Sequence, residues 1–322
     1  PTDPKNTPGP RICQGMAYDS NREVVVLYSG YWWGLIPPHT WEWDGLTWTK
    51  VSETGPVRYG FGMAFDPLRN VTVLYGGYND LVEEINLKTY SAPTWEYDGK
   101  EWKPIDLAGD APLVGAPLVY DEGLKCIIRH GGAPAEPTAT NIRNDTWKWD
   151  GVKWIKIAYG PVRVFHRLVY DTVRKRILLF GGIDKPGSAP GDTWEFDGTN
   201  WIQVSTEGPS GREWPGFVFD IARSVAVLFG GNQYHGFSPD TWLGDTWEWD
   251  GFQWREILSP GPGTTYLLDM AYDSRRGKTV VFRGAGGGTG TGTTLINLKP
   301  LQETWEYGLV TSGIPRRIWE GQ

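Results

Sequence analysis

One short block occurs six times along this chain. It reads Thr-Trp-Glu-aromatic, and the copies lie 47 to 58 residues apart. The leading tryptophans are Trp41, Trp95, Trp147, Trp194, Trp247 and Trp305. One copy carries Lys148 in place of the glutamate; five copies continue as Asp-Gly-x-x-Trp, and Trp319 is the expected counterpart in the sixth. A period of this length is typical of proteins whose repeated units stack side by side.

A second signature precedes each block. An aromatic-Asp pair and a polar turn lead into an apolar run that ends near Gly-Gly, as in Phe65-Asp66 followed by residues 71–77. The apolar run is typical of a strand buried on both faces, and the alternating block is typical of a half-buried strand. Asp-Gly between two strands predicts a tight hairpin, because glycine readily adopts a positive φ. Each unit is therefore predicted to hold four short strands.

Six four-stranded units predict an all-β chain. The expected architecture is a six-bladed β-propeller with four antiparallel strands per blade. Residues 1–322 are expected to form one domain, whose ring closes by packing of blade one on blade six. The predicted blades span residues 11–54, 55–107, 108–158, 159–206, 207–259 and 260–322.

Composition and charge narrow the possible partners. Aromatic residues make up 14% of the chain, which argues against disorder. A net charge of −7 argues against a basic face for nucleic acid, and no apolar run is long enough to span a membrane. The cysteines, Cys13 and Cys126, are expected to be packed thiols rather than a disulfide framework. The chain begins at Pro1, which fits a mature secreted protein or a trimmed chain.

Gly-Gly after an apolar strand, followed by a strand with tryptophan and by a further tryptophan, resembles the kelch repeat. The resemblance covers residues 11–319 and implies a propeller like the central one of galactose oxidase. The kelch family includes actin-binding scaffolds, ubiquitin-ligase subunits, sugar oxidases and sialic-acid mutarotases, so the resemblance implies little about function. The sequence motif Asp-Thr-Trp-Glu-Trp-Asp-Gly resembles that of bacterial kelch-containing proteins, many of which are exported. An extracellular or periplasmic location is therefore expected over a cytoplasmic one.

Four tryptophans lie outside the repeat positions. In a propeller, the connections from strand two to strand three and from strand four to the next blade emerge on one face, here named the loop face. The four tryptophans that map to this face are Trp32, Trp33, Trp214 and Trp242. Exposed there, their flat rings would suit a sugar, a peptide or an apolar ligand. The alternative is that they cap the end of the ring by local packing.

The histidines map to the same face. They are His39, His130, His166 and His235. His130 stands where other units have an aromatic residue before Gly-Gly, and Arg283 is aligned with the same position. The spacing of the histidines is no local metal motif, so no metal site is predicted, and any such site would have to be assembled by the fold.

Two charged residues are expected in the central channel. Strand one lines the channel, and the residue three places before its aromatic is small or proline in four units. In the other two units it is Arg167 or Asp269. A charge in a narrow channel is costly unless it is paired or hydrated. The pair is therefore either an ion pair, a hydrated site, or a polar grip on a ligand.

Two classes of function remain open, beside a third alternative of a purely structural adhesion module. The first is a soluble, monomeric propeller that binds a small molecule, carbohydrate or protein at the channel mouth on the loop face. Its expected ligand-binding residues are Trp32, Trp33, Trp214, Trp242, His235 and Arg283. The second is an isomerase, lyase or cyclase without a predicted cofactor.

The enzyme alternative assigns a role to each of a few residues. His166 or His130 would be the acid–base, Asp269 its carboxylate partner, and Arg167 or Arg283 the holder of an anion or oxyanion. Convergence of His166, Arg167 and Asp269 in one pocket with His130 would favour the enzyme. A flat aromatic face would favour binding.

Overall fold

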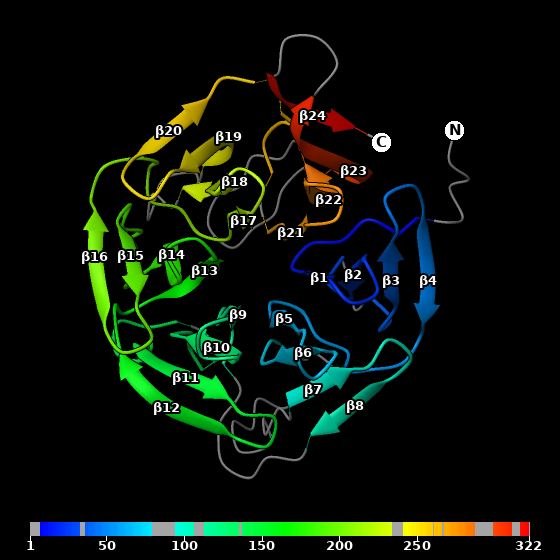
Figure 1. Cartoon of the computed structure of the whole chain (residues 1–322), viewed down its shortest axis with the longest axis horizontal. Coiled ribbons are helices and arrows are strands. Elements are labelled where there is room, and N and C mark those ends of the chain that lie inside the picture. The colour runs from blue at the N-terminus through cyan, green and yellow to red at the C-terminus, as the bar shows by residue number, and fades with distance from the viewer. Residues whose placement is uncertain are drawn as a thin grey trace.

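The computed structural model describes residues 7–32, 36–78, 94–105, 113–134, 137–233, 241–259, 261–265, 267–286, 299–310 and 316–321. Within these ranges the chain forms 24 strands in six four-stranded sheets, and it forms no helix. The sheets surround a central axis, with the first strand of each nearest the axis and the fourth outermost (Figure 1). The predicted all-β, six-bladed propeller is confirmed.

Each of the first three blades consists of four consecutive antiparallel strands. Blade one comprises β1 (Gly15–Asp19), β2 (Val24–Tyr28), β3 (Thr40–Trp43) and β4 (Trp48–Ser52). Blade two comprises β5 (Gly62–Asp66), β6 (Val71–Tyr75), β7 (Thr94–Tyr97) and β8 (Trp102–Ile105). Blade three comprises β9 (Leu118–Asp121), β10 (Cys126–His130), β11 (Asp145–Trp149) and β12 (Trp154–Tyr159).

The last three blades follow the same order. Blade four comprises β13 (Val164–Asp171), β14 (Arg176–Ile183), β15 (Thr193–Phe196) and β16 (Trp201–Ser205). Blade five comprises β17 (Gly216–Asp220), β18 (Val225–Gln233), β19 (Thr241–Trp249) and β20 (Trp254–Ile257). Blade six comprises β21 (Met270–Asp273), β22 (Lys278–Gly286), β23 (Lys299–Val310) and β24 (Arg316–Gly321).

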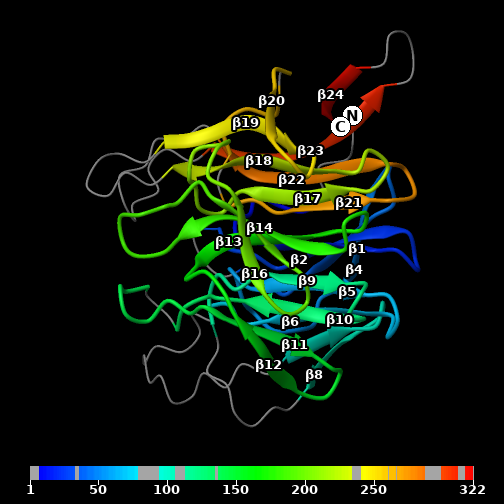
Figure 2. The same cartoon turned by 60° about the vertical axis from the view of Figure 1, so that its left-hand side comes forward.

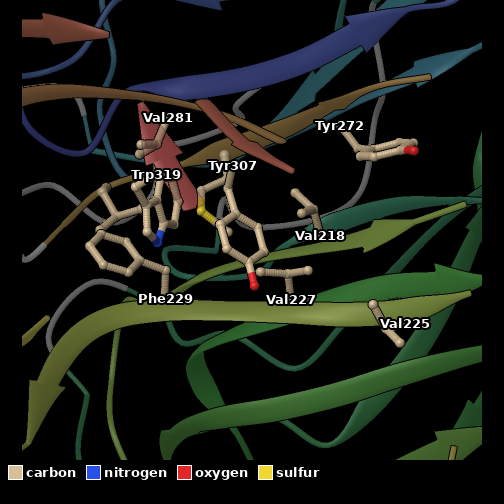
Figure 3. Packing of buried hydrophobic residues seen from close by; sticks show 10 residues of the cluster. Val218, Val225, Val227, Phe229, Tyr272, Val281, Tyr307 and Trp319 are labelled. Atoms are coloured by element: carbon tan, nitrogen blue, oxygen red, sulfur yellow. The ribbon is translucent and has the colours of Figure 1, made fainter. Parts of the chain in front are cut away.

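Each blade is built from one contiguous stretch of the chain, and no sheet combines strands from the two ends of the chain. The ring therefore closes by packing of blade one against blade six. In Figure 1 the blue blade one lies beside the orange and red blade six. Figure 2 shows the ring turned, with blades five and six at the top and the outer strands of blades two and three at the bottom. The core consists of six hydrophobic clusters, each between two neighbouring blades. Figure 3 shows the cluster between blades five and six, where the rings of Phe229 and Trp319 are 4.8 Å apart.

A hydrogen bond joins every pair of neighbouring blades at the same place. In each blade, the indole Nε1 of a tryptophan in strand four donates to the threonine hydroxyl that begins the repeated block in the preceding blade. In blades one to five this tryptophan begins the strand. The six pairs are Trp48–Thr304, Trp102–Thr40, Trp154–Thr94, Trp201–Thr146, Trp254–Thr193 and Trp319–Thr246, at 2.8 to 3.0 Å. Trp319 is thus the counterpart of the other five, as predicted.

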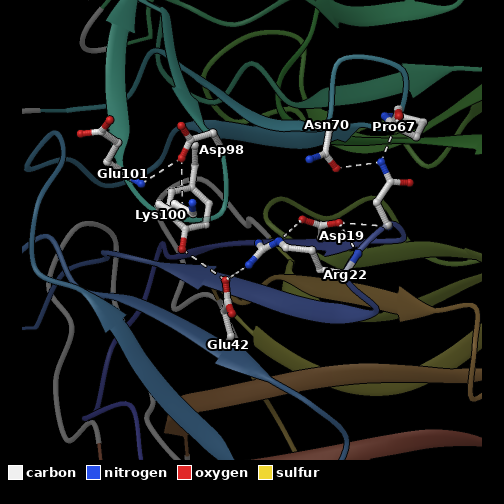
Figure 4. Close-up of polar contacts among 10 residues, drawn as sticks. Asp19, Arg22, Glu42, Pro67, Asn70, Asp98, Lys100 and Glu101 are labelled. Atoms are coloured by element: carbon white, nitrogen blue, oxygen red, sulfur yellow. Dashed lines mark hydrogen bonds and ion pairs between the residues drawn. The ribbon is translucent and has the colours of Figure 1, made fainter.

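The turn between strands one and two carries a repeated ion pair. Asp19 Oδ1 accepts the backbone N–H of Asn21 and of Arg22, and the Arg22 guanidinium bridges Asp19 and Glu42 at 2.7 and 2.5 Å (Figure 4). The same Asp–Arg–Glu group recurs in blades two, five and six. Blade three lacks both partners, because Leu124 takes the arginine position and Lys148 takes the glutamate position. In blade three, the replacement of the glutamate by Lys148 thus accompanies the replacement of the arginine by Leu124.

Candidate functional site

A ring of left-handed residues surrounds the loop-face end of the channel. These residues lie two places before the residue aligned with Arg167 and Asp269, and all have φ between 51° and 67°. They are Cys13, Gly60, Gly115, Phe165, Trp214 and Leu267. Five backbone hydrogen bonds of 2.9 to 3.2 Å run from the N–H of one ring residue to the carbonyl of its counterpart in the preceding blade. The left-handed conformation thus lets neighbouring blades bond directly at the axis.

Trp214 of blade five closes this end of the channel. A Cβ on Gly60, which lies in blade two on the opposite side of the ring, would be only 3.4 Å from Cη2 of Trp214. Phe165 stacks on Trp214 with ring centroids 4.8 Å apart and covers Gly115, where a Cβ would lie 2.3 Å from Cδ1 of Phe165. Trp214 is only 6% exposed. The expectation of an exposed platform is therefore wrong for Trp214, because the indole fills the axis of the ring.

Arg167 lies beneath this aromatic cap. Its Nε donates to the carbonyl of Pro215 at 2.9 Å and its Nη2 donates to the carbonyl of Leu268 at 2.7 Å. The guanidinium carbon is 5.5 Å from the centre of the Trp214 ring. Arg167 therefore connects blade four with blades five and six.

Asp269 completes the arrangement. It accepts the backbone N–H of Met16 in blade one at 2.9 Å and that of Met270 at 3.0 Å, and it lies 3.8 Å from Nη2 of Arg167. Burial raises the pKa of Asp269, and the charge of Arg167 opposes that rise. The structure thus brings the two charged channel residues together as an ion pair.

The backbone of the inner strands explains why Arg167 and Asp269 stand at this place in the channel. The first strand of each blade has no neighbouring strand on its channel side, so alternate N–H and C=O groups point into the channel. Arg167 satisfies two of these carbonyls and Asp269 satisfies two of these N–H groups. The side chains therefore replace a missing strand across four blades. Beside them, burial raises the pKa of Cys13 to about 12, so its thiol stays protonated.

The histidines do not join the ion pair. His130 Nε2 donates to the carbonyl of Pro161 at 2.8 Å, and its Nδ1 is 2.8 Å from the hydroxyl of Thr146. In blade one, Tyr28 contacts the carbonyl of Pro56 in the equivalent way. His130 thus performs the packing role of a repeat aromatic, and burial lowers its pKa to about 4.

His166 is buried beside His130. Their rings are 5.7 Å apart, and neither nitrogen of His166 has a hydrogen-bond partner in the described part of the chain. Burial lowers its pKa well below the usual range. Successive residues on a strand point to opposite faces of the sheet, so His166 faces blade three while Arg167 reaches toward blades five and six. The remaining described histidine, His39, is half-buried with Nε2 3.8 Å from Glu53.

The other predicted ligand-binding residues are dispersed. The alignment of Arg283 with the aromatic position is wrong by one residue, because Met270 pairs with Val281 and Phe282 takes that position. Arg283 instead donates to Thr265 at 2.8 Å and to Glu303 at 2.9 Å.

Trp242 is 7% exposed on β19, so it too is no exposed platform. In the sheet it pairs with Asn232 of β18. Trp33 and His235 lie outside the described residues.

A run of half-buried aromatic residues lies beside the cap on the loop face. Tyr31 and Tyr59 have ring centroids 5.0 Å apart, and Tyr59 stacks on Tyr78 at 5.1 Å. Trp32 packs against the buried cluster that contains Trp214. The sequence interpretation missed the three tyrosines, although Tyr31 and Tyr78 directly follow the Gly-Gly position of their blades. We name Tyr31, Trp32, Tyr59 and Tyr78 the aromatic run.

A cavity of about 270 Å³ occupies the rest of the channel. Its lining extends from the residue two places before the aromatic of the aromatic-Asp pair, such as Met16 and Leu168, to the turns between strands one and two, such as Ser20 and Thr172. We name this end of the ring the turn face. The cavity is therefore separated from the loop face by the ion pair and the aromatic cap.

No group of three or more His, Cys, Asp or Glu side chains among the described residues is placed to hold a metal ion. No helix in the same part of the chain has the length and apolar character needed to cross a membrane.

Comparison with known proteins identifies the fold. No family model matches the chain, and no curated protein matches it. Among solved structures, the chain is similar to one titled "Structure of YjhT", with a TM-score of 0.71 over 98% of this chain and 99% of the other. The two sequences are 14% identical, so the likeness concerns the fold alone. The chain is a six-bladed β-propeller.

Proposed function

We propose that this chain is a kelch-type propeller that binds a carbohydrate or another compact ligand on the loop face, beside the channel mouth. The observation that carries the proposal is the aromatic run, in which Tyr31, Tyr59 and Tyr78 contact one another ring to ring. A tyrosine ring can stack on the apolar face of a sugar, while its hydroxyl can form a hydrogen bond with the hydroxyl groups of the sugar. The buried cap and the ion pair beneath the run hold it on a rigid base.

The geometry favours binding over the enzyme alternative. An acid–base mechanism through His166 or His130 would need their nitrogens near Asp269 and Arg167. Both histidines are instead buried between blades three and four. The groups that the enzyme would use thus belong to two separate packing environments.

Ligand binding on the loop face is tested by saturation-transfer NMR with a panel of monosaccharides and disaccharides. Tyr59→Ala and Tyr78→Ala should each weaken the binding of a responding sugar by about tenfold, because stacking contacts of this kind contribute about 1 kcal/mol or more. Tyr159→Ala is the matched control, since Tyr159 is exposed on the outermost strand of blade three. No response to any sugar, or equal losses in all three variants, would contradict the proposal.

A further inference from the structure

The central channel is a blind pocket that opens on the turn face. Its lining ends at the level of Met16, Leu168 and Met270. Arg167 and Asp269 directly precede Leu168 and Met270 in the chain, so the ion pair lies next to the inner end of the pocket. A volume of 270 Å³ equals that of about nine water molecules at ~30 Å³ each, which is enough for a small organic ligand.

Most residues that line the pocket have apolar or aromatic side chains, and the lining also includes Ser20, Glu122 and Thr172. The lining includes the aromatic of the aromatic-Asp pair from every blade: Tyr18, Phe65, Tyr120, Tyr170, Phe219 and Tyr272. Around the opening, Leu68, Val173 and Ile221 are exposed on the turns of blades two, four and five. Exposed apolar groups that surround a concave apolar site are typical of ligand-binding sites.

A hydrogen-bond donor without a backbone partner lies next to the inner end of the pocket. Both oxygens of Asp269 already accept backbone N–H groups, whereas Arg167 uses only Nε and Nη2 on backbone carbonyls. Within the described residues, Nη1 of Arg167 makes no hydrogen bond. A guanidinium donor at the end of an apolar channel is suited to a carboxylate, which accepts charge-assisted hydrogen bonds.

We propose that this channel is a second binding site, entered from the turn face, for a small monocarboxylate with an aliphatic or aromatic body. The body occupies the apolar channel and the carboxylate accepts a hydrogen bond from Arg167 Nη1. This site is separate from the loop-face site, because the Trp214 cap lies between them.

The test is calorimetric titration of the full chain with octanoate, 1-octanol and octylammonium. Octanoate should bind most tightly. Thr172→Trp adds a bulky ring at the pocket opening and should weaken octanoate binding at least tenfold, and Leu46→Trp is the control. Leu46 is 77% exposed on the same face but does not line the pocket.

The inner end is tested separately with Arg167→Gln. This variant should reduce the preference for octanoate over 1-octanol about tenfold, because it removes the charge that the carboxylate contacts. If it does not fold, the Thr172→Trp result still decides whether the pocket is occupied. Absence of octanoate binding, equal binding to wild type and Thr172→Trp, or tighter binding of octylammonium would overturn the proposal.

Discussion

The Arg167 guanidinium of blade four donates a 2.7 Å hydrogen bond to the carbonyl of Leu268 in blade six, two blades away around the ring. It bonds to Pro215 of the intervening blade as well. A single side chain therefore ties three inner strands together at the axis. Asp269 extends the connection to blade one through Met16, so this group spans the place where the ring closes.

Arg167→Met is expected to lower the free energy of unfolding by about 3 kcal/mol, because it leaves the largely buried Asp269 without its partner. The control is Arg275→Met, which removes an exposed ion pair with Glu23 and should cost no more than about 1 kcal/mol. Urea unfolding followed by tryptophan fluorescence measures both values. Equal losses in the two variants would show that the channel pair is not a structural connection.

Thr246→Val tests the hydrogen bonds between blades. Valine keeps the shape of threonine but removes the oxygen that accepts from Trp319, so a buried indole N–H is left without a partner. The expected loss is about 1 to 3 kcal/mol. Thr199→Val, at an exposed hairpin of blade four, should change stability little. An unchanged unfolding midpoint for Thr246→Val would contradict the role assigned to this bond.

Acid should destabilise the fold through His130 and His166. Burial lowers both pKa values, that of His130 to about 4. Below about pH 6.5 the unfolded chain protonates these histidines while the folded protein keeps them neutral, so the unfolded state binds more protons. Stability should therefore fall as the pH drops from about 6.5 toward 4, by up to about 1.4 kcal/mol per pH unit for each histidine.

The control for this pH dependence comes from the repeat itself. His130→Tyr with His166→Phe introduces the residues found at the equivalent positions, Tyr75 and Phe61, in blade two. The double variant should show a flatter dependence of unfolding free energy on pH. His39→Gln should leave the slope nearly as it is in the wild type. An unchanged slope in the double variant would assign the acid effect to other groups.

Blade three should accept the ion pair that it lacks. Leu124→Arg and Lys148→Glu introduce the arginine and glutamate of the other blades, beside Asp121. Burial raises the pKa of Asp121, and the introduced arginine should lower it. A double-mutant cycle should give a favourable coupling of about 1 kcal/mol, because Leu124→Arg alone faces Lys148. Additive effects would show that the two positions do not meet.

Two departures from the sequence interpretation have physical causes. The alignment placed Arg283 one residue away from its true position because blade six lacks a glycine at the first position after Phe282, and only pairing with β21 defines the register. For Trp214, which lies outside the repeat positions, the sequence left exposure on the loop face and packing at the end of the ring both open. Its burial depends on Gly60 in blade two, which no local pattern connects with it.

The amino-acid sequence by itself determined the number of blades, the order of their strands and the turns between them. These features depend on short patterns that recur within each unit, such as Thr-Trp-Glu and Asp-Gly. Only the tertiary structure decided that Arg167 meets Asp269, that Trp214 closes one end of the channel, and that the cavity opens at the other. Those outcomes depend on side chains from blades far apart in the chain, which come together only when the ring closes.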